Sequence, residues 1–147
     1  MVSFVATPIG NLKDITLRAL ETLKNADVIF CEDTRHTLKL LNAYEIKKPL
    51  YACHKFNEKE AAERILEASR RGENVAVVSD AGTPVVSDPG NAVCRLLHEA
   101  GEPYTLLPGA CAFVAALVLS GLPADRFAFI GFLPDKAGEK KALLEKY

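Results

Sequence analysis

Short apolar runs alternate with polar loops along this chain, and each loop is followed by a segment of helix-like spacing. The five loops are Thr7–Asn11, Glu32–Arg35, His54–Asn57, Ser79–Pro84 and Pro108–Cys111, each directly after an apolar run. The run Val75–Val78 lacks the alternation of a half-exposed strand, which is typical of a parallel strand buried on both faces. The pattern predicts a doubly wound α/β fold, a five-stranded parallel sheet with helices on both faces.

The polar loops are expected at one edge of this sheet. Crossover connections bring the carboxyl ends of parallel strands together, and open α/β sheets bind their ligands at that edge. Gly10, Gly82 and Gly109 lie in three of the loops, where a backbone without side chains can approach a ligand closely. The arrangement predicts a binding cleft.

Capping residues predict where the helices begin. The start signals are, in chain order, Asp14 or Thr16, Thr34 or Thr37, Asn57 with Glu60 three residues later as a capping box, Asp88 with Pro89 at the first helical position, and Ala112. Gly72 and Gly101 predict the ends of the third and fourth helices.

A domain boundary is predicted near Pro123. Residues 1–123 would form the α/β domain, and residues 124–147 would open a second, incomplete domain with a strand at Phe127–Phe132. The alternative, in which residues 124–147 pack on the edge of the sheet, stays open.

Composition limits the possible partners. With 147 residues, 49% of them hydrophobic, the chain is long enough for one domain with a core, and its net charge of -1 argues against a globally cationic nucleic-acid-binding protein. The start Met1–Ser3 has no basic leader, and the longest apolar stretch is shorter than the about 20 residues of a membrane span, so a cytoplasmic protein is expected. The four cysteines lack C-x-x-C spacing, which favours reduced thiols over a metal site.

Several enzyme classes lack their motifs here. The sequence has neither G-x-G-x-x-G nor a phosphate-binding G-x-x-x-x-G-K-[ST], and no G-x-S-x-G or H-E-x-x-H. Taken singly, the loops also have structural interpretations, such as an ion pair among Glu32, Asp33 and Arg35 or a hydrogen-bonded His54. From 35 to 59, six basic residues stand against two acidic ones, a surface that could meet an anion or simply be solvated.

The loop motifs resemble one known family over essentially the whole chain. They are Thr-Pro-Ile-Gly-Asn-Leu at 7–12, Asp-Ile-Thr at 14–16, Glu-Asp-Thr-Arg-His-Thr at 32–37, Ser-Asp-Ala-Gly-Thr-Pro at 79–84, Asp-Pro-Gly at 88–90, Leu-Pro-Gly at 107–109, Gly-Leu-Pro at 121–123 and Gly-Phe-Leu-Pro at 131–134. In order and spacing they resemble the ribosomal RNA small subunit methyltransferase I family of the tetrapyrrole methylase superfamily.

The resemblance implies S-adenosylmethionine-dependent 2'-O-ribose methylation of a cytidine in 16S rRNA within the small ribosomal subunit. It also implies a homodimer of two-domain subunits, with the cofactor between the domains and no part for a metal or a membrane. The residues that fall where the superfamily holds the cofactor are Pro8, Ile9, Asp80, Ala81, Gly82, Thr83, Cys111 and Ala112. Candidates to accept the hydroxyl proton, or to fix the groups that do, are Glu32, Asp33, Arg35 and His54, on neighbouring loops.

Two departures qualify the resemblance. Family members are nearly twice as long, so we expect the isolated chain to be inactive. The family usually has His, an acidic residue, His, Asn and Glu where this chain has His54-Lys55-Phe56-Asn57-Glu58, which argues against a catalytic role for the second of those positions. Two other functions stay open: a superfamily methyltransferase acting on a tetrapyrrole-like small molecule, and a non-catalytic cofactor-binding or dimerisation domain.

Overall fold

The computed structural model describes residues 1–147 as two compact units, Met1–Cys111 and Ala112–Tyr147. Each unit is described by itself. The first holds strands β1 (Val2–Val5), β2 (Val28–Cys31), β3 (Leu50–Ala52), β4 (Val75–Val78) and β5 (Tyr104–Leu107), and helices η1 (Leu12–Asp14), α1 (Leu17–Asn25), α2 (Thr34–Ala43), α3 (Glu58–Arg70) and α4 (Asn91–Glu99). Strands and helices alternate as the hydrophobic pattern predicts.

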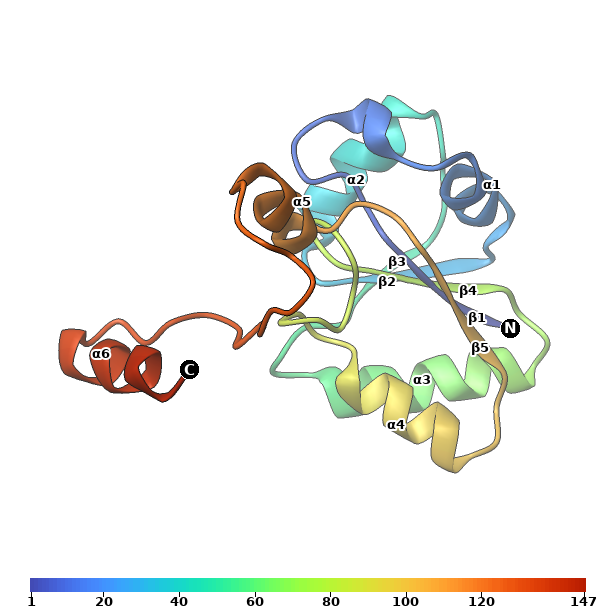
Figure 1. Cartoon of the computed structure of the whole chain (residues 1–147). Helices are drawn as coiled ribbons and strands as arrows, with labels where there is room; N and C mark the ends of the chain where they lie inside the picture. Colours follow the sequence, from blue (N-terminus) through green and yellow to red (C-terminus); the bar gives the residue numbers. More distant parts are fainter. The chain divides into compact units, whose positions relative to one another are not determined.

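The five strands form one sheet in the order β3-β2-β4-β1-β5, and every pairing is parallel (Figure 1). This confirms the predicted sheet. The central strand β4 is buried along its whole length because it has a strand on either side and helices on both faces. Its uniformly apolar sequence follows from that position.

Two apolar layers cover the sheet. On one face, alternate residues of β1, β2 and β4 pack against α3 and α4, with Ile65 and Leu97 fully buried. On the other face, the intervening residues pack against α1 and α2, with Leu23 and Leu41 nearly free of solvent contact. The two faces use alternate residues of each strand because successive side chains point to opposite sides.

The neighbouring strands β1 and β4 form a topological switch point. The chain leaves β1 for α1 on one face of the sheet and leaves β4 for α4 on the other face (Figure 1). Open α/β sheets bind ligands outside the carboxyl ends of strands whose connections leave on opposite faces. The fold therefore points to the loops that follow β1 and β4 as a ligand site.

The helix starts differ in part from the predictions. Thr16 caps α1 by accepting a hydrogen bond from the Ala19 amide, as predicted. Helix α2 begins at Thr34, one of the two predicted starts, and its capping side chain is Asp33, whose carboxylate accepts the Arg35 amide.

Two further start signals act differently from the prediction. Asn57 occupies the first cap position of α3 but makes no capping hydrogen bond, since its side chain is bonded within the preceding loop. The fourth helix begins at Asn91 with Gly90 as its cap, not at Pro89. Gly90 has φ +126°, a conformation that ends any helical path from Asp88.

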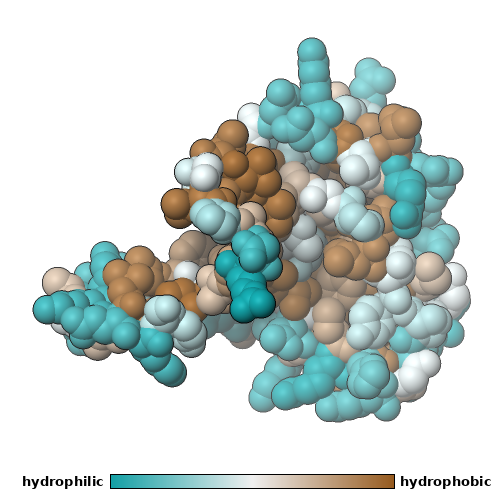
Figure 2. All heavy atoms as spheres, in the orientation of Figure 1, coloured by the Kyte–Doolittle hydropathy of each residue, from teal (hydrophilic) through white to brown (hydrophobic).

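The second unit contains helices α5 (Ala112–Leu119) and α6 (Ala137–Lys146) and no fully buried residue. Figure 2 shows apolar side chains gathered on the surface of α5, among them Val118 and Leu119. The predicted strand at Phe127–Phe132 is wrong, since the segment forms no strand in this structure. A domain boundary near Pro123 stays a prediction.

None of the helices has the length and apolar character of a membrane span.

All four cysteines carry free thiols, and Cys31 and Cys53 are buried. Desolvation raises the pKa of both buried thiols, that of Cys53 to about 12. Neither thiol is a nucleophile at neutral pH.

Candidate functional site

The loops that follow β1 and β4 are bonded directly to each other. Thr7 and Gly82 exchange two backbone hydrogen bonds, of 2.9 and 3.0 Å, as a short antiparallel bridge. The Thr7 hydroxyl donates to the Ser79 carbonyl at 3.2 Å, and the Ser79 hydroxyl donates to the Gly82 carbonyl at 3.2 Å. These bonds hold the two loops together at the carboxyl edge of the sheet.

A side chain at Gly82 would be strained and tightly packed. Its φ is +85°, and a Cβ atom there would lie 3.3 Å from Ile9 Cγ2 and 3.5 Å from the Ala110 carbonyl oxygen. The neighbouring Thr83 hydroxyl donates to the same carbonyl at 3.2 Å. Residues predicted to hold the cofactor in the loops after β1 and β4 thus lie beside the loop after β5.

Gly109 makes a second close approach. A Cβ atom at Gly109 would lie 2.8 Å from the Ala6 Cβ, closer than two carbon atoms approach without displacement. Because Ala6 ends the β1 segment, a side chain at Gly109 would displace the loop that carries Pro8 and Ile9. Cys111 closes the first unit and Ala112 opens the second, so their joint place in the site stays a prediction.

A hollow of roughly 210 Å³ opens at this edge between the sheet and α2. It is lined by Thr7, Pro8, Leu12, His36, Thr37, Lys39, Leu40, Ser79 and Asp80. Pockets for whole small molecules usually measure about 300–1,000 Å³, so this one fits a part of such a ligand. The sequence reasoning missed His36 and Lys39, although His36 belongs to the quoted motif at 32–37.

Asp80 joins the loop after β2 to the loop after β4. Its carboxylate accepts a hydrogen bond from the Asp33 amide at 3.0 Å. The next residue, Ala81, is exposed, which leaves its backbone accessible to a ligand. The predicted cofactor loops and the predicted catalytic loop at Glu32–Arg35 are therefore in direct contact.

The carboxylate of Asp33 is already hydrogen-bonded to the first turn of α2. It accepts the Arg35 amide at 2.8 Å and pairs with both Nε and Nη2 of the Arg35 guanidinium, at 3.1 and 2.7 Å. Hydrogen bonding to Arg35 lowers the pKa of Asp33 well below its usual range. The structural interpretation of these two residues as an ion pair is confirmed, and Arg35 fixes Asp33 rather than Glu32.

Glu32 lies in a different environment. Partial burial raises its pKa above the usual value, and the negative charges of Asp80 and Asp88 raise it further, while His54 opposes the shift. Partial burial, and then the charge of Asp80, also raises the pKa of Asp88. A carboxyl group whose pKa is raised holds and releases protons closer to neutral pH, as a general base must.

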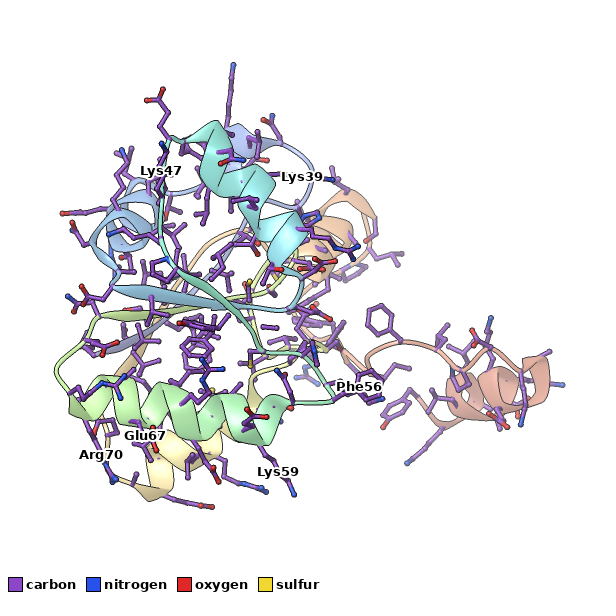
Figure 3. The ribbon with its side chains drawn as sticks, turned by 180° about the vertical axis from the view of Figure 1, so that it is seen from behind. Lys39, Lys47, Phe56, Lys59, Glu67 and Arg70 are labelled. Atoms are coloured by element: carbon purple, nitrogen blue, oxygen red, sulfur yellow. The ribbon has the colours of Figure 1, made fainter.

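His54 begins a short loop that its neighbours hold in place. The Asn57 side chain accepts the His54 amide at 2.8 Å and donates to the Ala52 carbonyl at 2.9 Å. The Nδ1 atom of His54 is buried and has no hydrogen-bond partner. Phe56, the middle of this loop, lies on the connection from β3 to α3 and is 93% exposed (Figure 3).

Glu58 ties this loop to the one that carries Asp88. Its carboxylate Oε1 accepts the amides of Gly90 and Ala92, each at 2.8 Å, and so caps α4 from another element. The segment before Gly90 includes Val85 at φ +78° and Ser87 at φ +63°, which are costly conformations for residues with side chains. Glu58 therefore stabilises a loop that is strained.

We expect Glu58→Ala to lower the free energy of unfolding by about 0.5–2 kcal/mol, the usual loss when a helix loses its cap. Glu60→Ala is the matched control, since Glu60 lies in the same first turn of α3 and makes no hydrogen bond there. Urea denaturation of the two variants measures the difference. Equal losses in both would show that the Glu58 contacts add nothing to stability.

The basic residues between 35 and 59 do not form one surface. Lys39 lies on α2 and Lys47 on the connection that follows it, whereas Lys59 lies on α3 across the sheet (Figure 3). The hypothesis of a single basic face for an anionic partner is wrong for this reason. The charges near the loop edge act separately.

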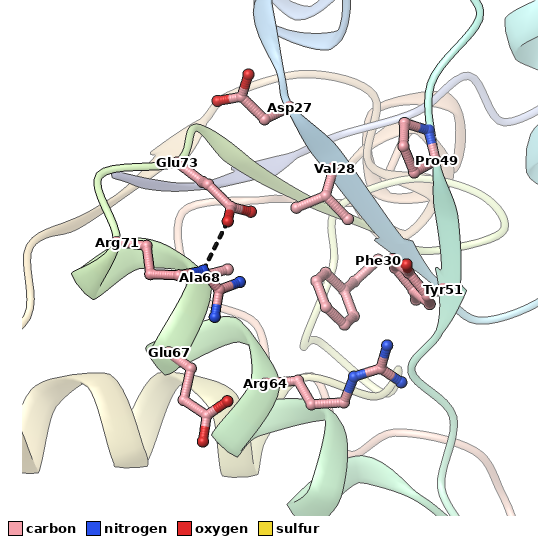
Figure 4. A pocket seen from close by; sticks show the side chains of 10 residues that line it. All are labelled: Asp27, Val28, Phe30, Pro49, Tyr51, Arg64, Glu67, Ala68, Arg71 and Glu73. Carbon is pink, nitrogen blue, oxygen red and sulfur yellow. Dashed lines mark hydrogen bonds and ion pairs between the residues drawn. The ribbon is translucent and has the colours of Figure 1, made fainter.

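A second hollow, of roughly 390 Å³, lies between α3 and the strands β2 and β3 (Figure 4). It contains no predicted site residue. The Arg64 guanidinium lies 4.3 Å from the centre of the Tyr51 ring, and Arg71 pairs with Glu73 at 2.8 Å. Both cations already have partners within the protein, so this hollow has a structural explanation.

A parallel sheet with linked loops at its carboxyl edge is typical of α/β domains that bind small molecules. No group of three or more His, Cys, Asp or Glu side chains is placed to hold a metal ion. The chain matches the family of Tetrapyrrole (Corrin/Porphyrin) Methylases over residues 1–147, and it belongs to that family.

Relatives and a solved structure agree with this membership. The chain is 54% identical to ribosomal RNA small subunit methyltransferase I of Haemophilus influenzae, over 96% of this chain and 50% of that protein. It is 50% identical to the protein of that name from Mycoplasmopsis pulmonis, over 99% of this chain and 65% of the relative.

The crystal structure of uroporphyrin-III-C-methyltransferase from Thermus thermophilus matches with a TM-score of 0.64 and 29% identity, over 83% of this chain and 53% of the other. The family resemblance expected from the motifs is confirmed. The chain spans about half the length of the Haemophilus influenzae relative.

Proposed function

We propose that this chain serves S-adenosylmethionine-dependent methylation of the 2'-hydroxyl of a cytidine in 16S rRNA, with the RNA assembled in the small ribosomal subunit. The observation that carries the proposal is the bonded set of loops at the β1/β4 switch point, together with about 50% identity to proteins named for small-subunit rRNA methylation. We further propose that the protein acts as a cytoplasmic homodimer, and that residues from 124 onward open its second domain.

The loops fit the proposed cofactor. Gly82 and Gly109 let the loops after β1, β4 and β5 pack closely, and the exposed backbone at Ala81 can bond a ligand without charged side chains. We assign Pro8, Ile9 and Asp80–Thr83, with Cys111 and Ala112, to holding S-adenosylmethionine. When bound, that cofactor supplies an electrophilic methyl group on a sulfonium.

The chain must hold the ribose hydroxyl in line with the methyl carbon and accept its proton. Positioning is the larger contribution, with effective molarities of about 10⁵–10⁸ M, and a general base adds about 10²–10⁴ in rate. Glu32 is the preferred base because its raised pKa and its free carboxylate suit proton transfer. His54, whose Nδ1 has no partner, orients the hydroxyl or relays the proton, while Asp33 and Arg35 hold the start of α2 in place.

Calorimetry with S-adenosylmethionine and a methylation assay on small ribosomal subunits test the proposal together. We expect the isolated chain to bind the cofactor without turnover. We expect turnover when the chain is fused to the remaining half of the Haemophilus influenzae relative, with the new methyl group found by mass spectrometry on a cytidine ribose. Methylation of a tetrapyrrole by the fusion, and not of the subunit, would favour the small-molecule alternative. Binding with no turnover in either protein would favour a non-catalytic domain.

A further inference from the structure

Phe56 exposes more of its side chain than any other aromatic residue of this protein, at 93%. Burial of such a side chain is worth about 1.5–3 kcal/mol, none of which folding uses here. A single exposed apolar residue has no meaning by itself. The position and the support of Phe56 are what point to a ligand.

Phe56 lies at the carboxyl edge of the sheet, beside the candidate reaction centre. Its ring meets that of His54 edge to face, with 6.1 Å between the ring centres. The Asn57 side chain bonds the Ala52 carbonyl and the His54 amide, and the Asn57 backbone amide donates to the His54 carbonyl at 3.0 Å. The ring is therefore carried by a fixed backbone, which lowers the entropic cost of binding on it.

Two lysines stand close to Phe56 in the sequence. Lys55 precedes it, and Lys59 projects from the first turn of α3 that follows (Figure 3). The carboxylate of Glu58 accepts two amides of α4, which leaves Glu60 as the one acidic side chain free on this loop and turn. An exposed aromatic ring with lysines nearby in the chain suits a base and its phosphates.

We propose that Phe56 is a stacking platform for a base of the RNA strand next to the reacting ribose, with Lys55 and Lys59 contacting flanking phosphates. The inference rests on the proposed function, since it takes RNA as the substrate. Single-stranded bases stack on such rings with about 1–3 kcal/mol each, and any base can do so. Phe56 would then hold the strand while Glu32 and His54 act on the hydroxyl.

Affinity for a single-stranded RNA oligonucleotide, measured by fluorescence anisotropy on the 147-residue chain, tests the platform. We expect Phe56→Ala to weaken binding about 5- to 150-fold and Phe56→Tyr to restore most of it. Lys55→Ala should reduce the slope of log affinity against log salt by about 0.7, the value for one phosphate contact on a single strand.

The absence of tryptophan from this protein gives a direct reporter of stacking. Phe56→Trp places the sole tryptophan on the platform, and we expect RNA to quench its emission. Asn25→Trp is the matched control, because Asn25 is exposed and ends α1, and the chain passes from there into the start of β2 at the opposite edge of the sheet. Its emission should not change.

Three results would overturn the inference. RNA binding by Phe56→Ala within twofold of the unaltered chain, or unchanged Phe56→Trp emission at saturating RNA, removes the platform and leaves the proposed function standing. A dimer that Phe56→Ala dissociates, with RNA affinity intact, assigns the ring to an interface between copies. Failure of the unaltered chain to bind RNA rejects the platform, whereas methylation of the ribosomal subunit by the fusion decides the RNA substrate separately.

Discussion

Replacing Gly82 with alanine is expected to weaken S-adenosylmethionine binding at least about tenfold, a change of about 1.4 kcal/mol. The new Cβ would lie 3.3 Å from Ile9 Cγ2 in a residue held at φ +85°. Either the backbone leaves the left-handed region or Ile9 moves, and both disturb the loops assigned to the cofactor. Calorimetry with the cofactor measures the effect.

Gly72→Ala separates backbone strain from ligand contact. Gly72 has the same φ of +85°, but nothing lies within 4 Å of the atom that alanine would add, and it follows the end of α3 far from the cofactor loops. Both variants should lose about 1–2 kcal/mol of folding free energy from the left-handed conformation. An equal loss of cofactor affinity in both would show that Gly82 acts only through stability.

Replacing Glu32 with glutamine is expected to lower turnover by about 10²–10⁴ while cofactor affinity stays within twofold. The amide keeps the size of the side chain but cannot accept the hydroxyl proton. His54→Ala should lower turnover as well, since it removes the imidazole that we assign to orienting the ribose hydroxyl or relaying its proton. Single-turnover methylation in the active fusion gives the rates, and calorimetry gives the affinity.

Asp33→Asn is the control, because we assign the Asp33 carboxylate to the start of α2 and not to proton transfer. Asp33 already bonds the Arg35 amide and guanidinium, and its lowered pKa makes it a weak base. We expect Asp33→Asn to retain far more turnover than Glu32→Gln. The reverse order would exchange their roles.

The pH dependence follows from the raised pKa of Glu32. A base must be ionised, so kcat/KM should rise with pH through a value above the ordinary 4.5 of a glutamate. Asp80→Asn removes a negative neighbour and should move this limb to lower pH. For folding stability the sign is opposite, because the folded protein holds the Glu32 proton more tightly than the unfolded chain does. The stabilisation from protonated Glu32 is complete below its unfolded pKa and is lost as pH rises through its folded pKa.

Sequence patterns predicted the strand positions closely because burial on both faces imposes an unbroken apolar run. Val75–Val78 is the clearest example, and its bounds match β4. The start of α4 could not be predicted in this way. Its acceptor is the Glu58 carboxylate from another helix, so Asp88 and Pro89 carried a local signal that a distant contact overrode.

The candidate site also has features that local sequence predicts and features that it does not. The positions of the loops, and of the glycines within them, can be predicted from residue types. The difference between Glu32 and Asp33 cannot, because adjacent carboxylates of similar chemistry differ only in what surrounds them: Asp33 is paired with Arg35, while Glu32 is partly buried near Asp80. The contribution of His36 and Lys39 to the hollow also depends on how α2 packs against the sheet.

The sequence by itself determined the alternation of strands and helices, the gathering of five loops at one sheet edge, and the family. The alternation follows from the hydrophobic period and local turn chemistry, the common edge from the crossovers between parallel strands, and the family from the motifs that resemble it. Only the tertiary structure decided that Thr7 and Gly82 bridge two loops, that Glu58 caps a distant helix, and which carboxylate stays free. Such contacts join residues far apart in sequence, and their energies depend on burial and neighbouring charges that exist only once the chain has folded.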